Sequence, residues 1–255
     1  MIKNIYKKKL ISFLLLILFA FYTQAQDILS SKKIIINSNL ELVRLNDNVW
    51  IHISYINLPG FGKTPANGLV VIDSNEAVLI DTPWNNELTD KLIEWVKNNL
   101  KIEIKYLIVT HFHDDCMGGI KVAHRQNIES YSLYLTSEIA KQKGLILPQK
   151  TFKNSLKLKI NSTELIINYP GAGHTVDNIV VWMPKYKILF GGCLVKSLKS
   201  KNLGNLEDAD IKEWPRTLQR LLKIYENAAI VVPGHGQYGG TDLIVHTIKL
   251  CKQNK

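Results

Sequence analysis

The segment from residue 110 to residue 119 carries the side chains best suited to chemistry, and it reads Thr-His-Phe-His-Asp-Asp-Cys-Met-Gly-Gly. His111 and His113 are two residues apart, and Asp115 follows two residues later. Imidazole and carboxylate groups are ligands that zinc accepts. The apolar residues 105–109 predict a buried strand, and the glycines behind the motif permit a tight turn. A loop there can point all three ligands inward, so the segment predicts a metal site.

Three further ligand-type residues stand beside glycines at the ends of predicted strands, namely His174, Cys193 and His235. Taken singly, each histidine would be structural or solvated, and the cysteine would be a buried apolar thiol. With the first motif they supply six donors, which is three for each of two ions. Catalytic zinc sites keep such open positions, whereas structural sites close with four protein ligands. The remaining histidines lie inside predicted elements and are not expected to bind metal: His52, His124 and His246.

Alternating and helical patterns supply the elements that must position these residues. Strands are predicted for residues 48–56, 68–73, 77–81, 102–109 and 229–232, and hairpins for residues 156–169 and 178–190. Helices are predicted for residues 86–100, 119–126, 137–144, 212–225 and 241–252. Residues 58–67 contain two prolines and two glycines and predict a long turn with Phe61 at its tip. Each half of the chain has strands and then helices, which predicts an α/β fold.

The chain has 255 residues, of which 46% are hydrophobic, so a sizeable core can form. Its first 25 residues have four lysines, an apolar stretch at residues 11–22 and a small residue, Ala25, at the end. This pattern predicts a signal peptide over residues 1–25, an exported domain over residues 26–255 and a periplasmic location. The alternative is an uncleaved anchor, but the apolar stretch is shorter than the roughly 20 residues that span a bilayer.

Net charge restricts the classes of molecule that the protein is expected to bind, and the cysteine count restricts its disulfides. Removing the four signal lysines lowers the net charge from +10 to +6. No basic run is interleaved with aromatic residues, so we expect no nucleic-acid partner, and an anionic small molecule suits the surface better. Three cysteines cannot form a disulfide framework. Cys116 could bind the second metal ion, pair with Cys193 or remain a free thiol at the floor of the site, and we expect the free thiol.

In its motifs and their order, the chain resembles the metallo-β-lactamase superfamily over essentially all of residues 26–255, and within it the subclass B1 enzymes. The resemblance implies an αβ/βα sandwich, in which two β-sheets pack face to face with helices on the outer faces. It implies two Zn²⁺ ions per chain. The first would take His111, His113 and His174. The second would take Asp115, Cys193 and His235.

The resemblance also assigns substrate-binding and catalytic roles. Lys196, three residues after the cysteine ligand, would hold the substrate carboxylate. Asn205 would bind substrate and donate to the developing oxyanion, and Asp115 would orient the nucleophile. Residues 58–67 would form a mobile flap that contacts substrate through Phe61. Cys116 departs from the B1 pattern, because many B1 members carry arginine at this position. In glyoxalase-like, lactonase-like and subclass B3 relatives, the same position holds a histidine ligand.

The implied function is zinc-dependent hydrolysis of the β-lactam amide bond of penicillins, cephalosporins and carbapenems by a zinc-bound hydroxide, which confers antibiotic resistance. The expected partner is a small β-lactam, and the expected enzyme is a monomer with no membrane partner after signal cleavage. One alternative is a thioesterase or lactonase on the same scaffold, against which Cys116 and Lys196 argue. Another is a non-catalytic zinc-binding protein, against which the complete ligand set argues.

Overall fold

The computed structural model describes residues 33–60 and 62–253. The predicted signal peptide and Phe61 lie outside these described residues. Within the described ranges, no helix is both long enough and apolar enough to cross a membrane.

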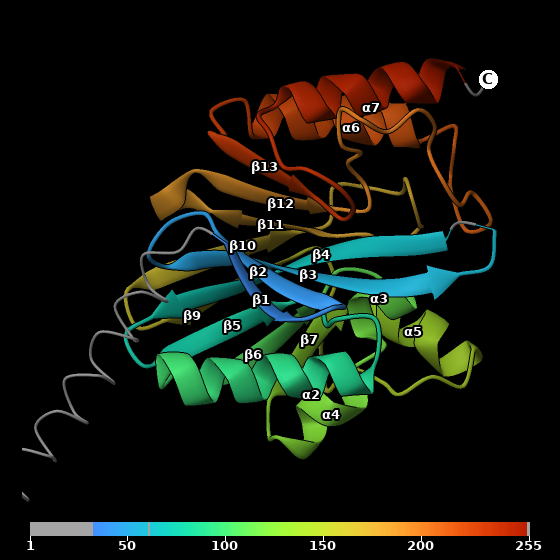
Figure 1. Ribbon diagram of the computed structural model, residues 1–255. Helices are drawn as coiled ribbons and strands as arrows, with labels where there is room; N and C mark the ends of the chain where they lie inside the picture. The colour runs from blue at the N-terminus through green and yellow to red at the C-terminus, as the bar shows by residue number, and fades with distance from the viewer. Residues whose placement is uncertain (1–32, 61, 254–255) are drawn as a thin grey trace, which may run out of the picture.

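Two β-sheets form the centre of the molecule (Figure 1). The first has eight strands in chain order: β1 (Lys33–Asn37), β2 (Leu40–Arg44), β3 (Val49–Leu58), β4 (Gly62–Asp73), β5 (Glu76–Ile80), β6 (Glu103–Val109), β7 (Glu129–Leu133) and β8 (Lys150–Phe152). It is antiparallel from β1 to β5 and parallel from β5 to β8. The second sheet has the order β13-β12-β11-β10-β9.

The strands of the second sheet are β9 (Ser155–Ile160), β10 (Thr163–Asn168), β11 (Val180–Met183), β12 (Ile188–Gly192) and β13 (Ile230–Pro233). Neighbouring strands are antiparallel except β12 and β13, which run parallel. Parallel neighbours present their carboxyl ends at one edge of a sheet, so the loops after β12 and β13 begin side by side.

Helices cover the outer face of each sheet (Figure 1). They are α2 (Asn86–Trp95), α3 (Asp114–Met117), α4 (Ile120–Arg125), α5 (Tyr134–Gln142), α6 (Trp214–Ile224) and α7 (Asp242–Gln253). α2 and α4 lie against the eight-stranded sheet, and α6 and α7 lie against the five-stranded sheet. α2 begins where the Asn85 side chain accepts the Leu88 amide at 3.0 Å.

The apolar core has three layers, as this arrangement requires. One cluster fills the space between the sheets, with Ile51, Val78 and Phe190 among its members. A second joins the eight-stranded sheet to α2 and α4, and a third joins the five-stranded sheet to α6 and α7. The predicted αβ/βα sandwich is therefore confirmed.

The structure differs from the sequence-based expectation at the chain start and at the flap. Residues 33–44, where no element was predicted, form the antiparallel pair β1 and β2. Residues 58–67, predicted as a long turn, are mostly strand, because β3 and β4 stay paired from Val49↔Val71 to Leu58↔Gly62. Pro65 is tolerated here because its carbonyl oxygen, rather than an amide N–H, makes the contact with the loop after β13. The flap is a β-hairpin with a short tip.

Candidate metal centre

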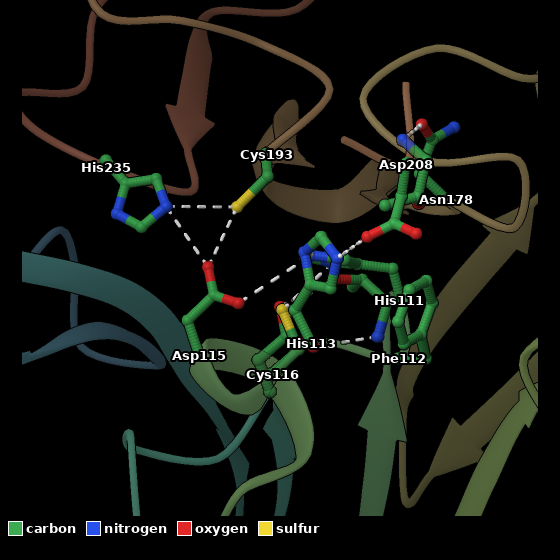
Figure 2. Close-up of polar contacts among 12 residues, drawn as sticks. His111, Phe112, His113, Asp115, Cys116, Asn178, Cys193, Asp208 and His235 are labelled. Carbon is green, nitrogen blue, oxygen red and sulfur yellow. Dashed lines mark hydrogen bonds and ion pairs between the residues drawn. The ribbon is translucent and has the colours of Figure 1, made fainter. Parts of the chain in front are cut away.

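The predicted ligands leave the two sheets at one common edge. His111 and His113 follow β6, Cys193 follows β12, and His235 follows β13. His174 lies in the loop between β10 and β11. Figure 2 shows the side chains from β6, β12 and β13 turned toward one another. Asp115, which was predicted on a loop, lies in the single turn of α3, and that turn directs its carboxylate at the same point.

Three imidazoles form the first group. The ligand nitrogens of His111, His113 and His174 all lie within 4.8 Å of one another. The His111 Nε2 and the His113 Nδ1 are 3.0 Å apart. The His174 ring lies 5.0 Å from the His111 ring and 5.3 Å from the His113 ring, edge to face with both. Such a trio supplies three sides of a tetrahedral zinc site and leaves the fourth open.

A carboxylate, a sulfur and an imidazole form the second group. The Asp115 Oδ2 lies 3.1 Å from the His235 Nε2 and 3.2 Å from the Cys193 Sγ. The Cys193 Sγ lies 3.3 Å from the His235 Nε2, which closes the triangle (Figure 2). The other oxygen of Asp115 is 3.7 Å from the His111 Nε2. Asp115 therefore lies between the two groups and joins them.

The outward nitrogens of three imidazoles are held by neighbouring groups. The His111 Nδ1 lies 3.1 Å from the Cys116 Sγ, and the His113 Nε2 donates to the Asp208 carboxylate at 2.9 Å. The His235 Nδ1 donates to the Pro65 carbonyl oxygen at 2.5 Å. A partner on the outward nitrogen fixes the tautomer and leaves the inward nitrogen available to a metal ion.

Sequence reasoning missed Asp208, and the role of Cys116 stays a prediction, because its sulfur lies in one group with His111, Asp115 and Cys193 that could hold a metal ion. Cys116 is a buried thiol beneath His111, and no described cysteine forms a disulfide, which argues against the expected alternative of a Cys116–Cys193 pair. Asp208 is 95 residues from His113 in the chain, in a stretch with no regular element. The only signal for it was a carboxylate shortly after Asn205 in the loop already assigned to the site.

Buried side chains fix the loops that carry the first group. The Asp81 carboxylate accepts hydrogen bonds from both the backbone amide and the hydroxyl of Thr110, each at 2.7 Å. Thr110 lies between the end of β6 and His111. The Asp177 carboxylate accepts the Phe112 amide at 3.1 Å. Asn178 accepts the Thr175 amide at 3.1 Å and donates to the Gly171 carbonyl at 2.8 Å, which closes the loop that carries His174.

Asn67 on β4 ties the loop of His235 to the first sheet. Its Nδ2 donates to the carbonyl oxygens of Pro233 and Gly236 at 2.9 and 2.8 Å, and its backbone amide donates to the Gly234 carbonyl at 2.8 Å. Together with the Pro65 contact, these bonds join two sheets that share no strand. The second group of ligands is therefore built across the interface between the sheets.

Electrostatics favour the forms of the side chains that bind a cation. Burial lowers the pKa of His111 to about 3 and holds the pKa of His174 well below its ordinary value, so both rings are neutral at pH 7. The Cys116 thiol lowers the pKa of Cys193 to about 6 against the effect of burial. Burial opposes ionisation of Asp115, but the His235 hydrogen bond and the nearby imidazoles keep its pKa well below its usual range.

The donor set fits zinc. Burial disfavours a charged His235, yet the negative Cys193 and Asp115 hold its pKa well above its ordinary value, so the ring keeps a proton facing them. A bound cation would replace that proton, since metal ligands bind in their deprotonated forms. Imidazole, thiolate and carboxylate at these separations are the ligands of zinc sites.

A groove of about 450 Å³ opens over the two groups. Its lining includes four of the six predicted ligands, namely His113, Asp115, His174 and His235. It also includes Leu58 from the flap, Trp84 from the loop after β5 and both predicted substrate-binding residues, Lys196 and Asn205. Lys196 is buried, with its ammonium 5.5 Å from the centre of the Trp214 ring. Asn205 is exposed, and its side-chain oxygen accepts the Glu207 amide at 3.1 Å, which leaves its amide nitrogen for the groove. Phe61 is outside the described residues.

Comparisons with known proteins agree with this geometry. The family profile described as "Metallo-beta-lactamase superfamily" matches residues 61–235, which is more than half of the chain. The chain is 39% identical to "Metallo-beta-lactamase type 2" from Bacteroides fragilis, over 89% of this chain and 91% of that protein. It is 43% identical to the protein of the same name from Bacillus cereus, over 84% and 83% of the two chains.

The fold agrees with a solved structure, that of a metallo-β-lactamase from Pontibacter korlensis. The TM-score is 0.82 at 44% identity, and the match covers 85% of this chain and all of that one. The converging ligands, the profile match and the relatives lead to one conclusion. This chain belongs to the metallo-β-lactamase superfamily.

Proposed function

We propose that this protein is a subclass B1 metallo-β-lactamase, which hydrolyses the amide bond of penicillins, cephalosporins and carbapenems with zinc and thereby confers antibiotic resistance. The observation that carries the proposal is the convergence of six side chains of the types that ligate metal ions, joined by Asp115, beneath one groove. The relatives named as metallo-β-lactamases, at 39–44% identity over most of the chain, support it.

Two zinc ions complete the site in this proposal. His111, His113 and His174 would hold one, and Asp115, Cys193 and His235 would hold the other. Bound zinc supplies Lewis acidity and lowers the pKa of water to about 7. Cys116 acts from beneath the site, by fixing the His111 ring through its Nδ1.

The protein's own side chains bind and orient the reactants. Lys196 attracts the carboxylate of the substrate, and the groove wall keeps its ammonium from bulk water. Asn205 directs its amide nitrogen at the carbonyl oxygen on which negative charge develops. Asp115, at the centre of the ligands, accepts a hydrogen bond from the attacking water and so orients it. Phe61, at the flap tip, contacts the apolar substituents of the substrate.

The rest of the proposal concerns the cellular context. Residues 1–25 are a cleaved signal peptide, residues 26–255 are the mature metallo-β-lactamase domain, and that domain works in the periplasm as a monomer. The basic, apolar and small-residue pattern of the first 25 residues supports export. The mature chain uses neither nucleic acid nor a membrane as a partner.

The test is nitrocefin hydrolysis by purified mature protein, with zinc content measured by elemental analysis. We expect up to two zinc ions per chain and activity that a chelator abolishes. Cys193→Ser should lose one zinc ion, whereas Cys251→Ser, at a buried cysteine on α7, should keep both. Turnover of S-lactoylglutathione without turnover of any β-lactam would contradict the proposal and identify a thioesterase.

A further inference from the structure

The segment that carries Lys196 and Asn205 has no strand or helix of its own. It runs from the end of β12 at Gly192 to the start of α6 at Trp214, and both residues line the groove. A long irregular segment gains its conformation from side-chain and backbone contacts with fixed elements. The position of the Lys196 ammonium therefore depends on whatever holds this backbone.

Two adjacent residues of α7 hold it. The Thr247 hydroxyl accepts the backbone amide of Lys196 at 2.9 Å and donates to the Leu243 carbonyl within the helix at 2.7 Å. His246 donates from its Nε2 to the Ser200 carbonyl oxygen at 2.9 Å. Thr247 is fully buried and His246 is partly buried. One turn of helix thus fixes both ends of residues 196–200.

The stretch between these two anchors is itself a closed turn. The Ser200 amide donates to the Ser197 carbonyl oxygen at 3.0 Å, and the two serine hydroxyls lie 3.2 Å apart. Upstream, the Trp214 indole N–H donates to the Leu194 carbonyl at 2.9 Å while the Lys196 ammonium lies near the Trp214 ring. With its backbone fixed at both ends and its side chain packed on an indole, Lys196 has little freedom before substrate arrives.

We propose that His246 and Thr247 are positioning residues that preorganise Lys196 for the carboxylate of the substrate. The inference rests on the proposed function, because it assigns these residues a part in substrate binding. Loss of either anchor lets the lysine occupy other positions, and substrate must then order it on binding. The effect falls on KM rather than on kcat, since the same contact serves the bound substrate and the transition state.

The experiment compares removal of each anchor with its conservative replacement. Thr247→Val and His246→Phe remove the hydrogen bonds, whereas Thr247→Ser and His246→Gln retain a hydroxyl and an N–H donor. Matched controls are Thr163→Val and His124→Gln, whose hydrogen bonds join Thr163 to Tyr186 and His124 to Ser130. Each variant is assayed with nitrocefin and with a nitrocefin ester whose carboxylate is blocked, and its zinc content is measured.

We expect Thr247→Val and His246→Phe to raise the KM for nitrocefin about tenfold, the effect of one lost hydrogen bond to a buried group. Their kcat and zinc content should stay within twofold of wild type, their KM for the ester should not change, and the conservative variants and controls should match wild type. An equal rise in KM for acid and ester, or an unchanged KM for both, would overturn the inference.

Only variants whose circular dichroism spectra match that of the folded wild type enter the comparison. If Thr247→Val does not fold, the pair His246→Phe and His246→Gln decides the question, because that side chain is partly exposed. A wild-type enzyme that turns over no β-lactam would refute the proposed function itself. By contrast, an active wild-type enzyme whose KM is unchanged by the His246 and Thr247 substitutions would refute only the inference about α7.

Discussion

His52 should make the stability of this protein depend on pH. The side chain is 1% exposed on β3, and its Nε2 donates to the Asp81 carbonyl oxygen at 3.0 Å. The Nδ1 is buried and has no partner among the described residues. Burial lowers the pKa of His52 from 6.5 to about 4. Because the folded pKa is the lower one, the unfolded chain takes up a proton first as the pH falls, and stability is lost between about pH 6.5 and 4.

The magnitude follows from the two pKa values. At pH 4.5, an unfolded pKa of 6.5 and a folded pKa of about 4 correspond to a loss of about 2.5 kcal/mol relative to pH 7. His52→Gln keeps an N–H donor for the Asp81 carbonyl and does not titrate. The wild type should therefore lose about 2.5 kcal/mol more unfolding free energy than the variant over this interval.

Urea unfolding at pH 7 and pH 4.5 measures this difference. A chelator is present throughout, so that zinc release does not contribute, and the titration of His111 and His174 cancels between the two proteins. His124→Gln is the control, since His124 is less buried and its pKa is lowered less. If wild type and His52→Gln lose the same unfolding free energy between pH 7 and pH 4.5, within about 0.5 kcal/mol, the assignment of a buried neutral histidine is refuted.

Three further predictions concern the metal centre and the flap. Asp208→Ala removes the acceptor that orients His113 and should weaken zinc binding at the first group by roughly 10- to 100-fold, which competition with a chromophoric chelator measures. Cys116→Ser keeps a hydroxyl beneath His111 and should retain two zinc ions and most activity; a variant that holds one zinc ion at saturating metal would show that Cys116 is a ligand. Phe61→Ala should raise the KM for bulky β-lactams without changing zinc content, and unchanged kinetics across substrates would exclude the flap tip from binding.

The sequence was sufficient to predict the fold and to predict that the ligands would converge. Long periodic segments such as residues 86–100 and 241–252 gave helices close to their observed bounds, because an apolar stripe leaves few other solutions. The first helix nevertheless ends at Trp95 and continues as a π-helical turn, Val96–Leu100, which Lys101 ends with φ +59°. Proline and glycine at residues 59–65 suggested a turn, but strand pairing with β3 prevailed over these local preferences.

The contacts that fix the ligands could not be predicted in the same way. Three of these contacts come from segments that are distant in the chain, and they involve Asp208, Pro65 and Asn67. None of the three residues lies in a sequence motif from which its partner could be predicted. Their contacts depend on how the two sheets pack, which a local pattern does not encode. The residue types of the predicted ligands and their order along the chain are local features, and a local motif can therefore predict them.

The two parts of the flap hairpin differ in their contacts with the second sheet. Pro65 and Asn67 hold the loop of His235, so a substitution there shifts a predicted metal ligand together with the wall of the groove. The described tip residues, Pro59 and Gly60, make no such contact, and open space surrounds Gly60. A change at the tip can therefore alter the rim of the groove without moving His235, whereas Gly60 itself, with φ +78°, remains a position that favours glycine. The base of the hairpin thus couples the wall of the groove to the second group of predicted ligands, and the tip does not.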